Sequence, residues 1–348
     1  MEIELGKLCR DFIKIKSKGS EMKKNTAGIL ACMALLLFIS TSWAADFPTK
    51  AMEWMAPFGP GGPSAIALKV IGDATSKTMG KPVLIVPAPG GGGTIGGARV
   101  AKAKPDGYTL LNANSATNAI SLYIKKEVPY TNRDFEFLAE FGALDLGLLI
   151  KGDSPFKTID DYIDFAKKNP SGIKQASTGS GTGGHFCLEL LKLRAGGLKI
   201  DMVPFKTSAE IRTAVLGGHC HAAFIYGGAG GPGDEFKQSI EGGGRILAVA
   251  SKNRLKAYPQ VPTFKEKGLD VVFSAWYGIA GPKGMPKDVS DKLKEAIYRA
   301  LHDPQVIQGV EGLGFRFEFR NSEEFTSFVG EFDTLVKKIV EEAKIQVE

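Results

Sequence analysis

Cysteine and histidine are scarce in this sequence, with four of each among 348 residues. So few thiols exclude a small fold held together by disulfides, and so few imidazoles leave little for a metal centre. His219 and His221 alternate at the start of a predicted strand and therefore share a face. No third ligand stands at motif spacing, so we expect a structural role for both and predict neither a metal nor a cofactor.

A strong excess of basic charge is also missing. The formal net charge is +6, and it falls to +3 without residues 1–44, which hold seven basic and four acidic side chains. The sequence shows no cluster of Lys and Arg interleaved with aromatic residues, which is the usual footprint of nucleic-acid binding. We therefore predict no nucleic-acid partner.

No apolar run in the sequence is long enough to span a bilayer, and a short one lies near the N-terminus, 28–39. This run follows basic residues, precedes small residues that end at Ala44, and is too short to span a bilayer. The pattern predicts a secretory signal peptide over 22–44 that is cleaved near Ala44, with 1–21 as an upstream extension. The triplet "LAC" ending at Cys32 resembles a lipoprotein box, but the apolar run continues beyond it, which favours cleavage over lipidation.

Two cysteines remain after such a cleavage, Cys187 and Cys220. An oxidising compartment would allow them to form a disulfide. However, Cys187 begins a predicted helix at the carboxyl edge of a sheet, whereas Cys220 begins a strand at the opposite edge. That separation exceeds the reach of a disulfide, so we expect both thiols to be free.

The mature chain of about 300 residues is long enough for two domains. Strand-like runs alternate with helix-like runs and are separated by Gly and Pro, which predicts an α/β fold with a parallel sheet. Two long apolar stretches, 136–152 and 271–282, are expected to cross between domains. The order predicts an outer lobe made from both chain ends (lobe 1, residues 45–145 and 272–348) and an inserted lobe (lobe 2, residues 146–271).

Gly179, Gly181 and Gly184 spell G-x-G-x-x-G, and Asp201 follows at about the distance of a ribose-binding acid. In a dinucleotide-binding fold, however, that acid ends its strand, whereas Asp201 precedes the apolar run "MVPF". The dinucleotide interpretation is therefore the weaker one. Nucleotide triphosphate and serine hydrolase motifs, G-x-x-x-x-G-K-[ST] and G-x-S-x-G, do not occur in the sequence.

Three turns share the order strand, small residues, helix, and they cover 57–64, 112–118 and 177–185. In a parallel sheet such turns lie at the carboxyl edge, where helix amino termini point unsatisfied N–H groups at one crevice. Glycine lets the backbone approach a ligand and hydroxyl residues add donors, so the turns could form an anion site without an arginine. The alternative is that these glycines only make tight turns. His185 could donate to a ligand or only decorate the helix start, and Trp276 and Tyr277 could belong to the core or line the cleft.

These motifs together resemble the Bug family, the periplasmic solute receptors of tripartite tricarboxylate transporters. The resemblance rests on "APFGPGGPS", "PAPGGGGTIGGARVAKAKPDGYTLL", "ASTGSGTGGHF", "VPFKTSAE", "LGGHCHAAF", "RILAVASKNR", "YPQVPTFKEKGL" and "WYGIAGPKGMP". It implies a two-lobed type II periplasmic binding protein with a cleft between the lobes, and not an enzyme. It further implies a small organic carboxylate as ligand, membrane permease subunits as partners and a periplasmic location; we expect a monomer.

The resemblance also implies a set of ligand-binding residues in the cleft. They are Phe58, Gly61, Gly62 and Ser64 in the first turn, Ser115 and Thr117 in the second, and Ser177, Gly179, Gly181, Thr182 and His185 in the third. The chain departs from the family pattern at Ala65 and Ile225, where members carry acids that could pair with an amine. This departure argues against an amino acid ligand, and Phe58, Phe205 and Tyr226 would suit a flat or aromatic carboxylate.

Two other functions stay open from the sequence. The same fold could serve an extracytoplasmic sensor that reports a solute to a signalling partner, or an exported α/β enzyme with an anionic substrate.

Overall fold

The computed structural model describes residues 47–59 and 61–346, of which Pro48 onward forms one compact unit. The predicted signal peptide and the upstream extension lie outside the described residues. Within the described part of the chain, no helix combines the length and apolar character needed to cross a membrane.

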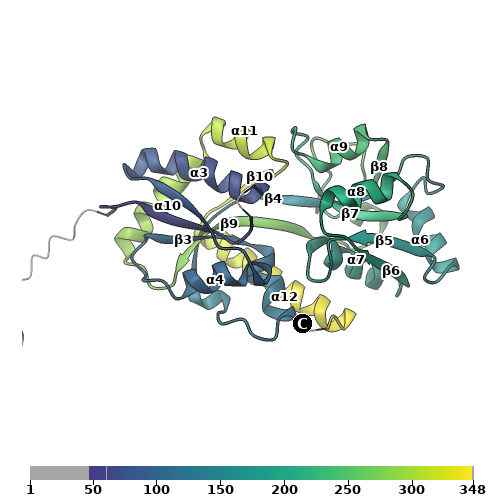
Figure 1. The fold of residues 1–348 in the computed structure, drawn as a ribbon, viewed down its shortest axis with the longest axis horizontal. Coiled ribbons are helices and arrows are strands. Elements are labelled where there is room, and N and C mark those ends of the chain that lie inside the picture. The colour runs from purple at the N-terminus through teal and green to yellow at the C-terminus, as the bar shows by residue number, and fades with distance from the viewer. Residues whose placement is uncertain (1–46, 60, 347–348) are drawn as a thin grey trace, which may run out of the picture. The chain divides into compact units, whose positions relative to one another are not determined.

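Ten strands of the described chain form one sheet, which runs through both lobes (Figure 1). In lobe 1, three parallel strands, β2 (Val83–Pro87), β1 (Met52–Ala56) and β3 (Thr109–Asn114), lead to the antiparallel β9 (Ser274–Pro282). In lobe 2, β7 (Ala222–Gly227), β5 (Ile173–Ser177) and β6 (Ile200–Pro204) are parallel to one another. The α/β class expected from the sequence is confirmed.

One long strand, β4 (Phe135–Lys151), joins the two halves of the sheet. Its first part pairs with β9 and with the short β10 (Arg316–Arg320), and its last part pairs with β7 and β8 (Gly244–Val249). Figure 1 shows β4 and β9 running between the lobes, as the two predicted crossing stretches require. All but two of the β4 residues are buried because both of its faces are covered, and its sequence accordingly reads as one apolar run. The residue limits of the lobes stay a prediction.

Helices cover both faces of each half of the sheet. In lobe 1, α3 (Pro63–Met79) packs against α10 (Lys287–Leu301) and α11 (Pro304–Gly312), and α4 (Thr94–Ala101) packs against β3. The helices of lobe 2 are α6 (Ile159–Lys168), α7 (Gly183–Arg194), α8 (Ser208–Leu216) and α9 (Glu235–Glu241). Local sequence sets their ends: Thr158 and Asp161 form a capping box at the start of α6, and Ile159, Tyr162 and Ile163 turn its apolar face to the core.

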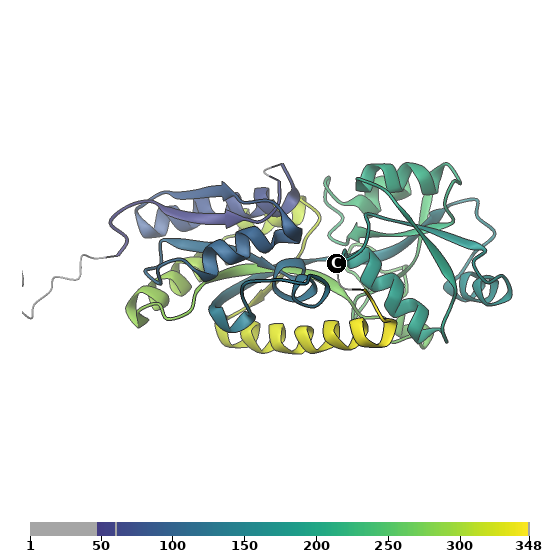
Figure 2. The same ribbon diagram turned by 60° about the horizontal axis from the view of Figure 1, so that its bottom comes forward.

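The C-terminal helix α12 (Ser322–Ala343) packs on β4 in lobe 1 and on α7 in lobe 2 (Figure 2). Fully buried Trp276 stands edge-on to Phe325 and Phe332 of this helix at ring-centroid distances of 5.4 and 6.0 Å. Phe332 in turn contacts Phe273, and Phe273 stacks on Phe186 of α7. The aromatic chain therefore continues the core of lobe 1 into lobe 2. The sequence left open whether Trp276 belongs to the core or lines the ligand cleft, and in the structure its ring belongs to the core.

The strand directions bring the carboxyl edges of the two lobes together. β3 ends with Asn114 opposite Tyr277, and β7 ends with Gly227 opposite Asp145. Tyr277 and Asp145 both lie where β9 and β4 pass from one lobe to the other. Because parallel strands end at the same edge, the turns that follow β1 and β3 face those that follow β5 and β7.

Candidate functional site

The first predicted turn leads from β1 into α3. Gly62 is the N-cap of this helix and supplies no side-chain cap, Pro63 follows it, and the first helical turn holds no acidic residue. Gly61 is exposed, and the space where its Cβ would stand is open. The positive end of the α3 dipole is thus left without a compensating charge from its own first turn, which suits an anionic group. Phe58 is half-buried beside this turn, and Ser64 is buried within it.

The second predicted turn follows β3 and is buried. The Asn112 Nδ2 group donates to the Ser64 carbonyl oxygen at 3.2 Å, which ties the second turn to the first. The Asn114 Oδ1 atom accepts a hydrogen bond from the Thr117 N–H at 3.0 Å, and Ser115 is 4% exposed. A π-helix, Ala116–Ile120, continues from this turn, and such a segment is frequent at functional sites.

The hydroxyl of Thr117 lies under a glycine segment that leads into α4. Among the described residues it has no hydrogen-bond partner, and the side chain is fully buried. A Cβ on Gly93 would lie 2.1 Å from the Thr117 Oγ1 atom. Four successive glycines, Gly90–Gly93, have positive φ angles, which only glycine adopts readily, and this allows the close approach. No role was predicted for this segment, although its four consecutive glycines are a recognisable signal in the sequence.

The third predicted turn leads from β5 into α7 and is held by its own hydroxyl groups. Thr182 donates from its Oγ1 atom to the Gly179 carbonyl at 2.9 Å and also caps α7 by accepting from the His185 N–H. The Ser177 Oγ atom accepts from the Gly179 N–H at 3.3 Å. Gly179 and Gly181 have φ angles of 107° and 76°, so the turn requires glycine at both positions.

His185 also stabilises the third turn. Its Nδ1 atom accepts a hydrogen bond from the Gly181 N–H at 3.2 Å, and its Nε2 atom lies 3.8 Å from a carboxylate oxygen of Glu189. The side chain is almost fully buried. These contacts support the turn, and the role of His185 in ligand binding stays a prediction.

The turns of the two lobes lie against each other. A Cβ on Gly181 would lie 2.2 Å from the Ile124 Cδ1 atom. Ile124 ends α5 (Ser121–Ile124), the short helix that follows the second turn in lobe 1. The structure therefore brings the third turn against the helix that follows the second turn, and Asn112 links the first turn to the second.

Two tyrosines lie on one face of the crossing strands. Tyr226 is paired with Leu146, and Tyr277 with Gly142, and this register places both rings on the same side of β4. A Cβ on Gly183, at the start of α7, would lie 2.8 Å from the Tyr226 hydroxyl. Burial raises the pKa of Tyr277 to about 12 and that of Tyr226 further, so both phenols stay protonated and able to donate.

Phe205 lies next to the third turn through its backbone, because its N–H donates to the Ser177 carbonyl oxygen at 2.8 Å. Its ring packs on the lobe 2 cluster around Ile211 and Val215. Ile225 belongs to that same cluster and faces away from Tyr226. Tyr226 is therefore the residue at the end of β7 that turns toward the predicted site.

The remaining candidates are placed elsewhere. The His221 Nδ1 atom accepts from the Lys174 N–H at 3.1 Å, and its ring lies near Phe156 and Phe165. Across the part of the chain that the structure describes, no group of three or more His, Cys, Asp or Glu is arranged to hold a metal. Cys187 and Cys220 are free and buried, and burial raises the pKa of both thiols.

The fold and the facing turns define a class, the two-lobed α/β proteins that bind a solute between their lobes. A model of that class, the tripartite tricarboxylate transporter family receptor, matches residues 67–345. The chain belongs to this family.

Relatives and solved structures agree with this assignment. The chain is 29% identical to a UPF0065 protein of Cupriavidus necator, over 90% of this chain and 94% of that one, and 29% identical to BugT of Bordetella pertussis, over 83% and 89%. Its fold is similar to the periplasmic binding protein BugD, with a TM-score of 0.71 and 25% identity over 87% of this chain and all of that one. It is also similar to MatC of Rhodopseudomonas palustris with bound malate, with a TM-score of 0.70 and 25% identity over 84% of this chain and all of that one. The resemblance to the Bug family and the two-lobed fold are thereby confirmed.

Proposed function

We propose that this protein is a periplasmic receptor that captures a small organic carboxylate between its lobes and delivers it to the permease subunits of a tripartite transporter. The family supports a solute-binding role, and a relative of similar fold holds malate. The single observation that carries the proposal is that a hydrogen bond joins the first two glycine- and hydroxyl-rich turns of lobe 1, while the third turn, from lobe 2, lies against the helix that follows them. Export through the predicted signal peptide would bring the receptor to its solute.

In this proposal the carboxylate is held by backbone N–H groups and hydroxyls. The amino terminus of α3 offers N–H groups at Gly61 and Ser64, whereas the Gly62 N–H donates to the Gly59 carbonyl oxygen. Ser115 adds a hydroxyl from the second turn. Each helix dipole contributes roughly 0.3–1 kcal/mol, and up to about 2 kcal/mol when partly buried. Binding favours lobe closure because the ligand interacts with both lobes only in the closed state.

The rest of the ligand is proposed to lie against lobe 2. The third turn, with Ser177, Gly179, Gly181 and Thr182, supplies backbone groups, and Tyr226 supplies an aromatic face and a hydroxyl. His185 supports this turn from behind. Phe58 and Tyr226 favour a flat or aromatic carboxylate over an amino acid, since Ile225 stands where family members carry an acid.

A thermal-shift screen tests the proposal. The probes are benzoate, malate and citrate, with benzylamine and glucose as controls without a carboxylate. We expect at least one carboxylate to raise the Tm in a concentration-dependent manner, because a ligand that binds only the folded state stabilises it. Stabilisation by the controls and by no carboxylate would refute an anion site.

A further inference from the structure

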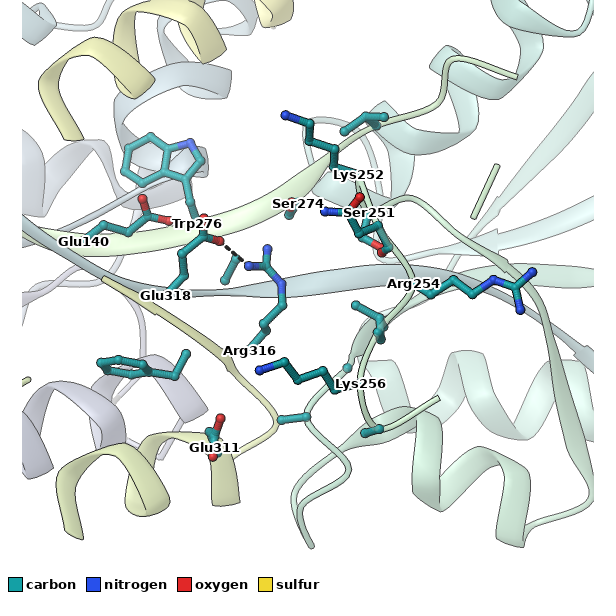
Figure 3. A pocket seen from close by; sticks show the side chains of 18 of the residues that line it. Glu140, Ser251, Lys252, Arg254, Lys256, Ser274, Trp276, Glu311, Arg316 and Glu318 are labelled. Atoms are coloured by element: carbon teal, nitrogen blue, oxygen red, sulfur yellow. Dashed lines mark hydrogen bonds and ion pairs between the residues drawn. The ribbon is translucent and has the colours of Figure 1, made fainter. Parts of the chain in front are cut away.

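A hollow lies at the junction of the lobes. It is a cavity of about 510 Å³, lined from lobe 1 by β4, β9, β10 and the end of α11, and from lobe 2 by the segments that follow β7 and β8 (Figure 3). None of the thirteen residues predicted to bind the carboxylate lines it.

The strand register places this cavity on the opposite face of the crossing strands from the two tyrosines. Ala143 is paired with Trp276, and both line the cavity. The paired residues Gly142 and Tyr277 are their immediate neighbours and therefore point to the other side. The crossing strands thus separate the proposed ligand cleft from a back cavity, the name used below.

The lobe 1 wall of the back cavity carries a chain of ion pairs. Arg316 binds buried Asp145 at 2.7 Å and also binds Glu318, while Arg320 binds Glu318 and buried Glu140. Three acids therefore face two arginines. Burial raises the pKa of Glu140, and its protonation would leave this chain neutral.

Glu311 adds an acidic group to the same wall. It lies at the end of α11, is exposed, and forms no side-chain ion pair with any residue of 47–59 or 61–346. The lobe 1 wall is thus net negative whether Glu140 is protonated or not.

The lobe 2 wall carries the opposite charge. Lys252 and Lys256 are exposed on the segment after β8, and neither forms an ion pair within the described chain. In Figure 3 both side chains extend from this segment toward lobe 1, whereas Arg254 points away. Arg254 is neutralised by Glu266 at 2.9 Å. Two uncompensated cations of one lobe therefore face an acidic wall of the other.

If the lobes close on a solute as proposed, closure also acts on this cavity. The crossing strands β4 and β9 lie between it and the proposed ligand cleft, so a rotation about them that narrows the ligand cleft would widen the back cavity. Widening separates the two lysines from Glu311, the acid of this wall that is in no ion pair of the described chain, and it weakens their Coulomb attraction.

We propose that the Coulomb attraction between Lys252 and Lys256 and the acidic lobe 1 wall favours the open receptor and lowers its affinity for ligand. The proposal rests on the proposed function, because it assumes that the lobes close on a solute. Each exposed pair contributes modestly, so loss of both lysines should tighten binding by about two- to fivefold.

The test compares the variant K252Q/K256Q with a matched control, K199Q/K265Q. The control removes two exposed lysines of lobe 2 that do not line the cavity. Small-angle scattering of the ligand-free proteins is the first measurement, and we expect a smaller radius of gyration for K252Q/K256Q only. Salt at about 1 M, where the screening length is about 3 Å, should compact the wild type and leave the variant unchanged.

The second measurement is calorimetric affinity for the tightest of the three carboxylate probes. Tighter binding by K252Q/K256Q and unchanged binding by the control support the proposal that the two lysines favour the open receptor. Scattering and salt response equal to those of the control overturn it. The scattering needs no ligand, so it tests the role of the two lysines even if no probe binds. Failure of every probe to bind would count against the proposed function and not against the role of the lysines.

Discussion

At the residue scale, the predicted site is built from side chains that are already committed to the backbone. Thr182 and His185 hold the third turn, and Asn112 joins the first two turns. The N–H groups of Gly62, Gly179 and Gly181 are likewise used within their turns, so what stays available is N–H at positions such as Gly61 and the hydroxyls of a few residues such as Ser115. A site of this kind is rigid before ligand arrives, which lowers the cost of ordering it on binding.

Ser115→Ala and Ser177→Ala test the hydroxyl contribution. A lost hydrogen bond to a charged group costs about 1.5–3 kcal/mol, or roughly ten- to 150-fold in affinity. We expect such weakening by calorimetry, with little change in Tm. Thr78→Ala, at the exposed far end of α3, is the matched control. Wild-type affinity in both serine variants would show that the site is misplaced.

Tyr226→Phe tests the second contact proposed for the ligand. The phenol is protonated throughout the physiological range, so it acts as a donor, and its loss should lower affinity by about two- to tenfold. Tyr298→Phe, on the exposed side of α10, is the control and should leave the affinity for ligand unchanged. Equal affinities for both variants and the wild type would remove Tyr226 from the site.

At the element scale, the glycine segment before α4 sets the position of the second turn. Gly93→Ala would introduce both a strained φ angle and a contact of 2.1 Å with the Thr117 hydroxyl. Gly80→Ala is a matched control, because Gly80 has a similarly positive φ of 68° but open space around it. The control should cost about 1–2 kcal/mol of unfolding free energy in urea titrations.

Gly93→Ala should lower the free energy of unfolding by more than Gly80→Ala does. It should also weaken ligand binding, since the Thr117 side chain must shift. If the two variants lost equal stability and bound ligand equally, the packing between Gly93 and Thr117 would have no role in the site.

The burial of Glu140 on β4 makes stability depend on pH. Burial raises the pKa of Glu140 from an ordinary 4.5 to about 8, against the opposing effect of Arg320. The folded state therefore binds this proton more tightly than the unfolded chain. The resulting stabilisation is complete below about pH 4.5 and is lost as the pH rises through about 8.

Urea titrations between about pH 5 and about pH 8 check this dependence. The free energy of unfolding should fall with rising pH, and Glu140→Gln should reduce the slope, with the remainder due to Asp145, whose pKa is also raised by burial. Glu331→Gln, an exposed change on α12, should keep the wild-type slope. An unaltered slope in Glu140→Gln would show that Glu140 is ionised in the folded protein.

At the scale of the whole molecule, the sequence predicted the lobes and missed one strand. The parallel strands were recognisable because each apolar run is bounded by Gly or Pro, and β4 and β9 because their apolar runs are long. The missed strand β10, "RFEFR", carries three charges and is only half-buried, so it read as surface. Its partners, Glu140 and Asp145, were the available signal, because acids within an apolar run are rarely buried without cations.

The candidate site shows a similar limit. Turn positions follow from glycine and hydroxyl spacing, so the three turns were predictable. Their mutual contacts were not, because Gly181 meets Ile124 and Asn112 meets Ser64 only through the tertiary fold. The back cavity depends on strand register across the crossing, which no local pattern encodes.

The central claim is that turns from facing lobes bind one carboxylate through backbone and hydroxyl groups. A crystal structure of the complex with the tightest of the carboxylate probes tests it most directly. We expect a carboxylate within hydrogen-bond distance of the α3 amino terminus and Ser115, with the remainder of the ligand against Tyr226 and the third turn. A carboxylate bound instead by Arg316 or the lysines of the back cavity would contradict it.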